Sequence, residues 1–174
     1  MDKNIILDGD RIELVSVREE YIFKIMKWKN DERIRKWFLS NGGIDEEMQR
    51  IWFSRYEERQ DDIMFVIKVK ENGKIIGSVA LYSIDFKEKN CEFGRMVIGE
   101  WQYLRKGYAK EAIKIISKYA FKKLEMKQIN LEVLSSNERA IKLYEKIGFV
   151  YDEQVEKKGI KLIRMVLTRG YKHD

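Results

Sequence analysis

Residues 92–112 place the strongest constraint on how this chain can fold. The stretch opens with strand-forming residues, passes through a polar loop, and becomes helical in pattern from Gly107 onward. The first N–H groups of a helix lack partners and carry partial positive charge. Gly107 lets an anion approach the backbone closely, and Arg105, Lys106 and Lys110 add positive charge. The stretch therefore predicts a strand–loop–helix unit that holds a pyrophosphate.

Its spacing excludes two common phosphate-binding motifs. The chain contains no G-x-x-x-x-G-K-[ST] run, so a P-loop is not indicated. It also contains no G-x-G-x-x-G, so a dinucleotide-binding fold has no support. An ordinary strand–loop–helix crossover without a ligand remains the alternative.

Composition narrows the class of protein further. The 174 residues suit one domain, 1–174, and 44% hydrophobic with 37% charged residues is typical of a globular protein. The chain has a single cysteine, Cys91, which excludes an internal disulfide. It has a single histidine, His173, so we expect neither a metal site nor a histidine-based triad. No apolar run approaches the roughly 18 residues of a membrane span, and the acidic N-terminus does not resemble a signal peptide. We therefore expect a cytoplasmic protein without a membrane partner.

The net charge of +6 allows two interpretations. One is nucleic-acid binding, which predicts steeply salt-dependent affinity. The lysines, however, alternate with acidic residues along the chain, as on solvated surfaces, and the basic loop explains part of the excess. We expect no nucleic-acid partner.

Hydrophobic periodicity predicts an α/β domain with a mixed, mostly antiparallel sheet of about seven strands flanked by helices. The strands are expected at 11–15, 63–69, 74–84, 91–98, 128–134, 149–156 and 162–168. Helices are expected from a Ser16 cap to Asn30, over 32–38, over 45–60, after Gly107, and over 137–147. Asn72-Gly73 predicts a hairpin turn.

Two motifs resemble the signatures of the GCN5-related N-acetyltransferase (GNAT) family. Residues 104–109, LRKGYA, resemble its [QR]-x-x-G-x-[GA] loop, with Leu104 where the family prefers Gln or Arg. Residues 131–149, LEVLSSNERAIKLYEKIGF, resemble its second signature, a strand and Asn followed by A-I-x-L-Y-x-x-x-G-F. The order of the predicted elements also resembles the GNAT fold, in which the fourth and fifth strands splay apart.

The resemblance implies acetyl-CoA as the acyl donor, with coenzyme A as product, and direct attack by an amine in a ternary complex. Its cofactor-binding residues would be Met96, Val97 and Ile98 for the pantetheine arm, Arg105, Lys106, Gly107, Tyr108 and Ala109 for the pyrophosphate, and Asn137 for the arm. Its catalytic residues would be Tyr144, which protonates the leaving thiolate, and Glu92, which matches a base used by some members.

Each of these roles has a simpler structural alternative. Asn137 suits a helix N-cap, and Tyr144 lies on an apolar helix face where it can be core. Glu92 lies four residues, roughly 13 Å of strand, from Met96, so it would act through water or a bent strand, or be a plain surface carboxylate. Trp37 and Trp52 are expected to wall the acceptor pocket, with core packing as the alternative.

The acceptor amine is predicted only by resemblance. The outline resembles the RimJ/RimL-like branch, which acetylates ribosomal-protein N-termini, and also enzymes that acetylate polyamines. Residues 30–37, NDERIRKW, resemble enzymes acting on nucleotide-linked amino sugars, including those of pseudaminic acid synthesis. We expect an amino sugar or another small amine as acceptor and a monomer or homodimer. A non-catalytic acyl-CoA sensor is the remaining alternative.

Overall fold

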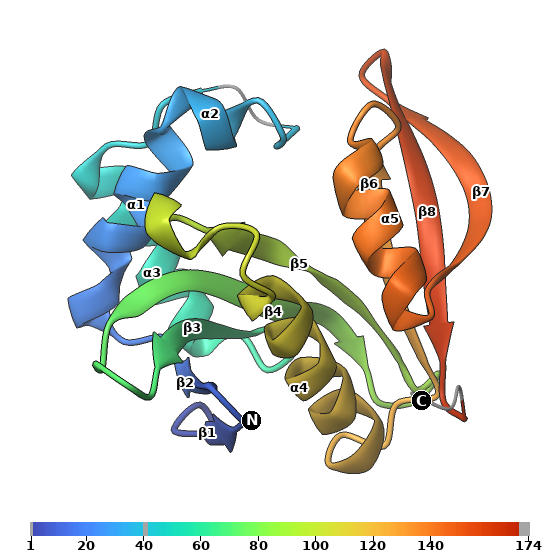
Figure 1. The fold of residues 1–174 in the computed structure, drawn as a ribbon, viewed down its shortest axis with the longest axis horizontal. Coiled ribbons are helices and arrows are strands. Elements are labelled where there is room, and N and C mark those ends of the chain that lie inside the picture. Colours follow the sequence, from blue (N-terminus) through green and yellow to red (C-terminus); the bar gives the residue numbers. More distant parts are fainter. Residues whose placement is uncertain (1, 40–41, 171–174) are drawn as a thin grey trace.

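Eight strands form one sheet in the order β1-β2-β3-β4-β5-β6-β8-β7 (Figure 1). The computed structural model describes residues 2–39 and 42–170, so His173 lies outside the described residues. The strands are β1 Ile6–Asp8, β2 Ile12–Ser16, β3 Ile63–Val69, β4 Ile75–Asp85, β5 Asn90–Ile98, β6 Gln128–Leu134, β7 Val150–Lys157 and β8 Ile160–Thr168. Every neighbouring pair is antiparallel except β5 and β6, which are parallel.

The helices begin where local capping chemistry places them. They are α1 Ile22–Asn30, α2 Glu32–Arg35, α3 Glu46–Glu58, α4 Tyr108–Lys122 and α5 Glu138–Ile147, with short 3₁₀ turns at Glu19–Tyr21 and Trp101–Tyr103. The side chains of Asp31, Asp45 and Asn137 accept hydrogen bonds from first-turn N–H groups of α2, α3 and α5. Gly148 ends α5 in the left-handed conformation, at φ 111°.

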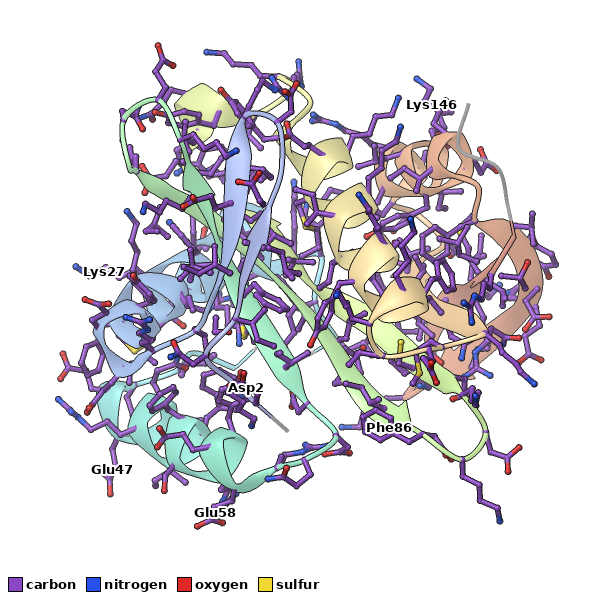
Figure 2. The ribbon with its side chains drawn as sticks, turned by 90° about the horizontal axis from the view of Figure 1, so that it is seen from below. Asp2, Lys27, Glu47, Glu58, Phe86 and Lys146 are labelled. Atoms are coloured by element: carbon purple, nitrogen blue, oxygen red, sulfur yellow. The ribbon has the colours of Figure 1, made fainter. Side chains whose placement is uncertain are left out.

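The two faces of the sheet carry separate hydrophobic cores. One core joins the sheet to α4 and α5, and it includes Ile113 and Ile116 of α4 and Ile147 of α5. The other joins the opposite face to α1 and α3 through residues such as Ile25 and Phe53. Figure 1 shows α4 on the near face of the sheet and α3 behind it. Charged side chains such as Lys27, Glu47, Glu58 and Lys146 project outward around these layers (Figure 2).

Strands β5 and β6 separate along most of their length. Their pairing runs only from Asn90 opposite Gln128 to Glu92 opposite Asn130, although β5 continues to Ile98 and β6 to Leu134. Figure 1 shows the two strands meeting at one end and diverging toward α2 and the start of α5. The predicted splay between the fourth and fifth expected strands is thereby confirmed.

Three details differ from the sequence-based expectations. The sheet has eight strands rather than about seven, because the three-residue β1, too short to show a period, pairs with β2. Ser16 does not cap a helix, because it ends β2 and its hydroxyl exchanges hydrogen bonds with the backbone of Ile5. The helix expected over 32–38 ends at Arg35.

None of the helices within 2–39 and 42–170 combines the length and apolar character needed to span a membrane. Over the same residues, histidine, cysteine and acidic side chains form no group of three or more that could hold a metal ion.

Candidate active site

A cleft of about 1120 Å³ opens where β5 and β6 separate. Its walls come from the two diverging strands, the start of α4, the length of α5, and the segment around α2. Most of the predicted cofactor residues line it: Met96, Val97, Ile98, Arg105, Gly107, Tyr108, Ala109 and Asn137. Lys106 does not line it. The tertiary structure therefore brings together two motifs, 104–109 and 131–149, that are separate in the sequence.

The loop before α4 has the conformation of an anion-binding site. Arg105 and Gly107 both take left-handed backbone conformations, at φ 61° and 85°. Gly107 is the N-cap of α4, and a glycine offers no side chain to cap the helix. The first-turn N–H groups of α4 are therefore open to an external acceptor, beside the basic Arg105 and Lys110 of the cleft wall.

Arg11 braces this loop, and sequence reasoning did not identify it. Its guanidinium donates to the carbonyl oxygen of Lys106 at 2.9 Å, pairs with Glu111 at 3.0 Å, and lies over the ring of Tyr108 at 4.4 Å. A Cβ added to Gly107 would lie 3.2 Å from this guanidinium. No local signal could have revealed the contact, because Arg11 lies 95 residues before Lys106.

A bulge in β5 changes which side of the sheet its residues face. Ala80 and Ser78 of β4 pair with Gly94 and Val97, so one extra β5 residue is inserted between them. Before the bulge Phe93 packs on the α4 side, whereas after it Met96 packs there. The bulge contains Arg95, which has a left-handed φ of 51°.

The bulge directs a backbone donor into the cleft. The carbonyl oxygen of Arg95 accepts a hydrogen bond from Ser78 Oγ of β4 at 3.1 Å. In a trans peptide the C=O and the following N–H point in opposite directions. We therefore expect the N–H of Met96 to point away from Ser78, and β5 has no partner strand on its other side at this position. The guanidinium of Arg95 reaches across β4 to Asp62, just before β3, in two hydrogen bonds of 2.7 and 2.8 Å.

Tyr144 of α5 lines the cleft beside the diverging strands. Its ring packs edge-on against Phe93 of β5, with centroids 5.9 Å apart, and against Phe149 at 5.8 Å. Burial, and then the neighbouring Tyr82, raise the pKa of Tyr144 to about 12. Its hydroxyl is therefore protonated at neutral pH, and within the part of the chain that the structure describes it has no hydrogen-bond partner.

Asn137 combines a structural contact with a place in the cleft wall. Its Oδ1 accepts the N–H of Ala140 at 3.2 Å, which is the N-cap role that the sequence left open. The same residue lines the cleft at the start of α5.

Two acidic residues near the cleft, Glu92 and Glu132, differ in position and in pKa. Glu92 does not line it, because the residue sits at the last paired position of β5 and β6, where burial raises its carboxyl pKa. Glu132 does line the cleft, but hydrogen bonds from Lys157 and Arg164 hold its pKa below the ordinary value despite the opposing effect of burial. Cys91 is buried, and this burial raises its thiol pKa to about 12, so it is not a nucleophile.

The two tryptophans predicted for the acceptor pocket occupy different places. Trp37 lines the cleft and is 42% exposed. Trp52 does not line it; its ring stacks on Tyr56 of α3 with centroids 5.5 Å apart. Trp101 lines the cleft as well, with the guanidinium of Arg33 over its ring at 3.7 Å.

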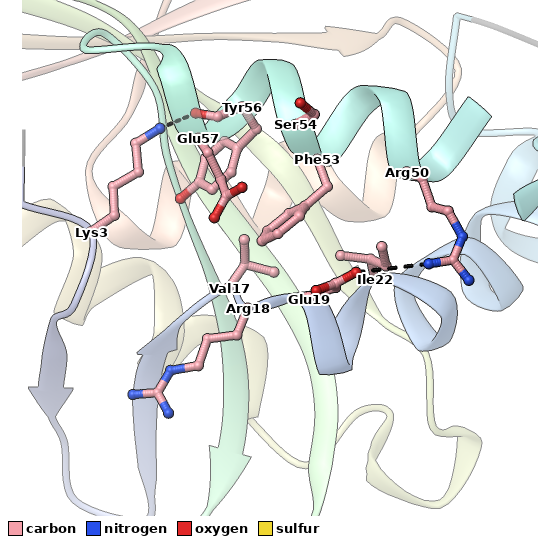
Figure 3. A pocket seen from close by; sticks show the side chains of 10 residues that line it. All are labelled: Lys3, Val17, Arg18, Glu19, Ile22, Arg50, Phe53, Ser54, Tyr56 and Glu57. Atoms are coloured by element: carbon pink, nitrogen blue, oxygen red, sulfur yellow. Dashed lines mark hydrogen bonds and ion pairs between the residues drawn. The ribbon is translucent and has the colours of Figure 1, made fainter. Parts of the chain in front are cut away.

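A second hollow of about 480 Å³ lies between α3 and the segment that joins β2 to α1 (Figure 3). Its floor consists of Val17, Ile22 and Phe53, and its rim carries charged side chains such as Arg50, which pairs with Glu19 at 3.7 Å. No residue of either predicted motif lines this hollow. The cleft between β5 and β6 is therefore the candidate active site.

Comparison with known proteins agrees with this geometry. A family model described as an acetyltransferase (GNAT) domain matches residues 11–150, which include the cleft-forming strands, α4 and α5. The chain belongs to the GNAT acetyltransferase family. As a member of that family, it is an N-acetyltransferase that uses acetyl-CoA.

Relatives of this GNAT protein include both uncharacterised and named enzymes. An uncharacterised N-acetyltransferase of Bacillus subtilis, the prophage-derived YokL, is 28% identical over 166 residues, which are 95% of this chain and 87% of the relative. The alpha/beta-tubulin N-acetyltransferase 9 of Mus musculus is 24% identical over 86% of this chain and 66% of its own length.

Solved structures show the same GNAT fold. Spermidine N-acetyltransferase from Vibrio cholerae, solved in complex with CoA and spermine, superposes with a TM-score of 0.83 at 21% identity, covering 91% of this chain and 95% of that one. FdhC, a nucleotide-linked sugar GNAT solved in its apo form, superposes with a TM-score of 0.81 at 21% identity, covering 95% and 90%.

The residues of this GNAT cleft fit acetyl-CoA. The uncapped start of α4 with its basic loop suits a pyrophosphate, and the unpaired edge of β5 suits the amide groups of a pantetheine arm. Acetyl-CoA brings the thioester carbonyl that an amine attacks.

Proposed function

We propose that this acetyltransferase acetylates the primary amine of a small anionic acceptor, such as a nucleotide-linked amino sugar. The observation that carries the proposal is the chemistry of the cleft beyond the cofactor loop. The lining there includes aromatic side chains and guanidinium groups, beside the aliphatic Ile34 and Leu39: Arg33, Trp37, Phe38, Tyr82, Arg95 and Trp101. Two acidic residues, Glu132 of β6 and Glu138 of α5, also line the cleft, and Glu132 is bound by Lys157 and Arg164.

This lining suits an aromatic, phosphate-bearing acceptor better than a polyamine. Guanidinium groups bind phosphates through paired donors, and exposed tryptophan rings provide stacking surfaces for planar heterocycles. Arg33 lies over the Trp101 ring at 3.7 Å and pairs with Asp31 at 2.7 Å, so a phosphate would share its guanidinium with that carboxylate. A polycation would need free carboxylates along its path; of the two acidic lining residues, Glu132 is already bound by Lys157 and Arg164, and Glu138 lies in the first turn of α5.

The catalytic roles follow from the two faces of the cleft. The basic loop before α4 holds the pyrophosphate on one face, and Met96, Val97 and Ile98 pair with the pantetheine arm inside the gap. The acceptor enters from the opposite face, on which Tyr82 and Arg95 lie. The N–H of Met96 donates to the thioester oxygen, which develops negative charge when the amine attacks.

Proton transfers complete the proposed reaction. Tyr144 donates its hydroxyl proton to the departing sulfur, since its pKa of about 12 keeps it protonated. Glu92 accepts the proton of the amine through intervening water, because it lies outside the residues that line the cleft. Asn137 contacts the cofactor arm from the start of α5.

A panel of amines tests the proposed acceptor. Thiol release from acetyl-CoA would be followed with a nucleotide-linked amino sugar, with spermidine, and with a peptide bearing a free N-terminus. The amino sugar should give the highest kcat/KM, and Arg33→Gln should lower that value while leaving the KM for acetyl-CoA unchanged. Faster turnover of spermidine or of the peptide would contradict the proposal, and no turnover of any amine despite tight acetyl-CoA binding would indicate a sensor.

A further inference from the structure

Asp62 is a buried carboxylate that makes its main contacts with a residue of the bulge. Its side chain is 2% exposed and lies just before β3, two strands away from β5. Both of its oxygens accept hydrogen bonds from the Arg95 guanidinium, at 2.7 and 2.8 Å. Arg59 approaches it at 3.8 Å from the exposed side, so Arg95 is its closest cationic partner.

The conformation of Arg95 needs an external restraint. A left-handed backbone is unfavourable for a residue with a Cβ, and Arg95 adopts it inside a strand, at φ 51°. Two groups hold it there: Ser78 Oγ binds its carbonyl oxygen, and Asp62 binds its side chain. The ring of Tyr82 packs against the same guanidinium at 4.9 Å.

We propose that Asp62 is a positioning residue for acetyl transfer. By holding the Arg95 guanidinium from β3, it maintains the bulge that points the N–H of Met96 into the cleft. The carboxylate touches neither donor nor acceptor, so it acts only through the β5 backbone. This inference rests on the placement of the thioester oxygen at the Met96 N–H proposed above.

A simple contribution to stability does not explain this pair as well. Replacing a buried ion pair by well-packed apolar residues is often neutral or stabilising, so net stability is a weak reason to retain this pair. Arg95 is the one left-handed residue within the described part of β5. The pair connects it to Asp62, which lies just before β3, and β3 does not neighbour β5 in the sheet.

The test uses a direct probe of carbonyl polarisation. A ketone analogue of acetyl-CoA, labelled with ¹³C at its carbonyl, would be bound to each variant, and its chemical shift would be compared with that of the free analogue. Affinity for coenzyme A would be measured by calorimetry on the same samples. Neither measurement requires knowledge of the acceptor amine.

Asp62→Ala should lose more than half of the bound-minus-free shift and keep its affinity for coenzyme A. Asp61→Ala is the matched control, because Asp61 precedes Asp62 and pairs with the exposed Arg59 instead. It should retain the full shift.

Two double variants separate backbone geometry from the loss of a buried charge. In Asp62→Ala/Arg95→Gly and Asp62→Ala/Arg95→Ala no partner of the pair remains charged, so both should fold even if Asp62→Ala does not. Glycine adopts a left-handed backbone without penalty, whereas alanine does not. The glycine variant should therefore recover part of the shift that the alanine variant lacks.

Two results would overturn the inference. A full shift in Asp62→Ala, or equal shifts in the two double variants, would show that Asp62 does not position Met96. If the wild-type protein itself binds coenzyme A but shows no shift of the analogue, the thioester placement fails, and the inference falls with it.

Discussion

The ring of Tyr144 on α5 meets the ring of Phe93 on β5 edge to face, at 5.9 Å and 78°. This contact lies beside the opening of the β5–β6 gap, just beyond the last paired residue, Glu92. It fixes the Tyr144 side chain against one wall of the cleft while its hydroxyl remains without a protein partner among the described residues. A fixed, protonated phenol beside the gap is placed to donate a proton to a departing thiolate, and its raised pKa makes it a weaker acid than an ordinary tyrosine.

Tyr144→Phe tests this role, because it keeps the ring packing and removes only the hydroxyl. We expect kcat to fall by about 10²-fold or more, the usual contribution of a positioned acid. The melting temperature and the affinity for acetyl-CoA should barely change. Since the pKa is about 12, the wild-type kcat should show no decline from Tyr144 ionisation below pH 11 or so. Lower stability with kcat retained would identify Tyr144 as a core residue only.

Gly107→Glu should abolish acetyl-CoA binding in calorimetry. The substitution places bulk and negative charge at the open start of α4, where the pyrophosphate is proposed to bind. Gly107→Gln has the same size and the same backbone strain, at φ 85°, without the charge, and it should bind more tightly than the glutamate variant. Gly43→Glu, where a Cβ meets no atom within 4 Å, should bind normally. Unchanged affinity in a folded Gly107→Glu protein would place the pyrophosphate elsewhere.

Trp37→Ala and Trp52→Ala should have different consequences. Trp37 is exposed in the cleft, so its loss should raise the acceptor KM without affecting the melting temperature or the KM for acetyl-CoA. Trp52 packs on Tyr56 outside the cleft, so its loss should lower the free energy of unfolding by about 2 kcal/mol or more. Steady-state kinetics and denaturant unfolding of both variants measure the difference. A stable Trp52→Ala protein with a raised acceptor KM would instead place Trp52 in the acceptor pocket.

Lys29 makes stability depend on pH in the alkaline range. Burial, and then the neighbouring guanidinium of Arg95, lower its pKa from 10.5 to about 8. Between pH 8 and 10.5 or so, Lys29 is protonated in the unfolded chain and largely neutral in the folded one. The contribution of Lys29 to the free energy of unfolding therefore rises as the pH rises from about 8 to 10.5. At pH 7 the buried charge opposes folding.

Lys29→Met should therefore raise the free energy of unfolding at pH 7, by about 1–3 kcal/mol. The advantage of the variant should shrink as the pH approaches 10.5, because the wild-type lysine becomes neutral in both states. Urea unfolding of both proteins at a series of pH values isolates this residue, since all other groups are shared. A difference independent of pH would show that Lys29 keeps an ordinary pKa.

Local sequence signals were sufficient for the elements that build the cofactor half of the cleft. The strand at 128–134 and the hairpin turn at Asn72-Gly73 agree with the structure, and α5 begins after its Asn137 cap. Gly107 marked the start of α4 and Gly148 the end of α5. These features depend on residues within one or two turns of each other, so a single stretch of sequence contains the interactions that specify them.

The distant residues that support the cleft, and those that lie outside it, depend on how the strands and helices pack together. Arg11 reaches the Gly107 loop across 95 residues of sequence, and Asp62 reaches Arg95 across 33. Glu92, a plausible base by its position in the motif, lies where β5 and β6 are still paired and therefore outside the cleft lining. The strand–loop–helix unit could be predicted from a short stretch of sequence, because capping and glycine conformations are local properties. The bulge at Arg95 depends on the register between β4 and β5 and on a carboxylate two strands away, and no local pattern specifies either.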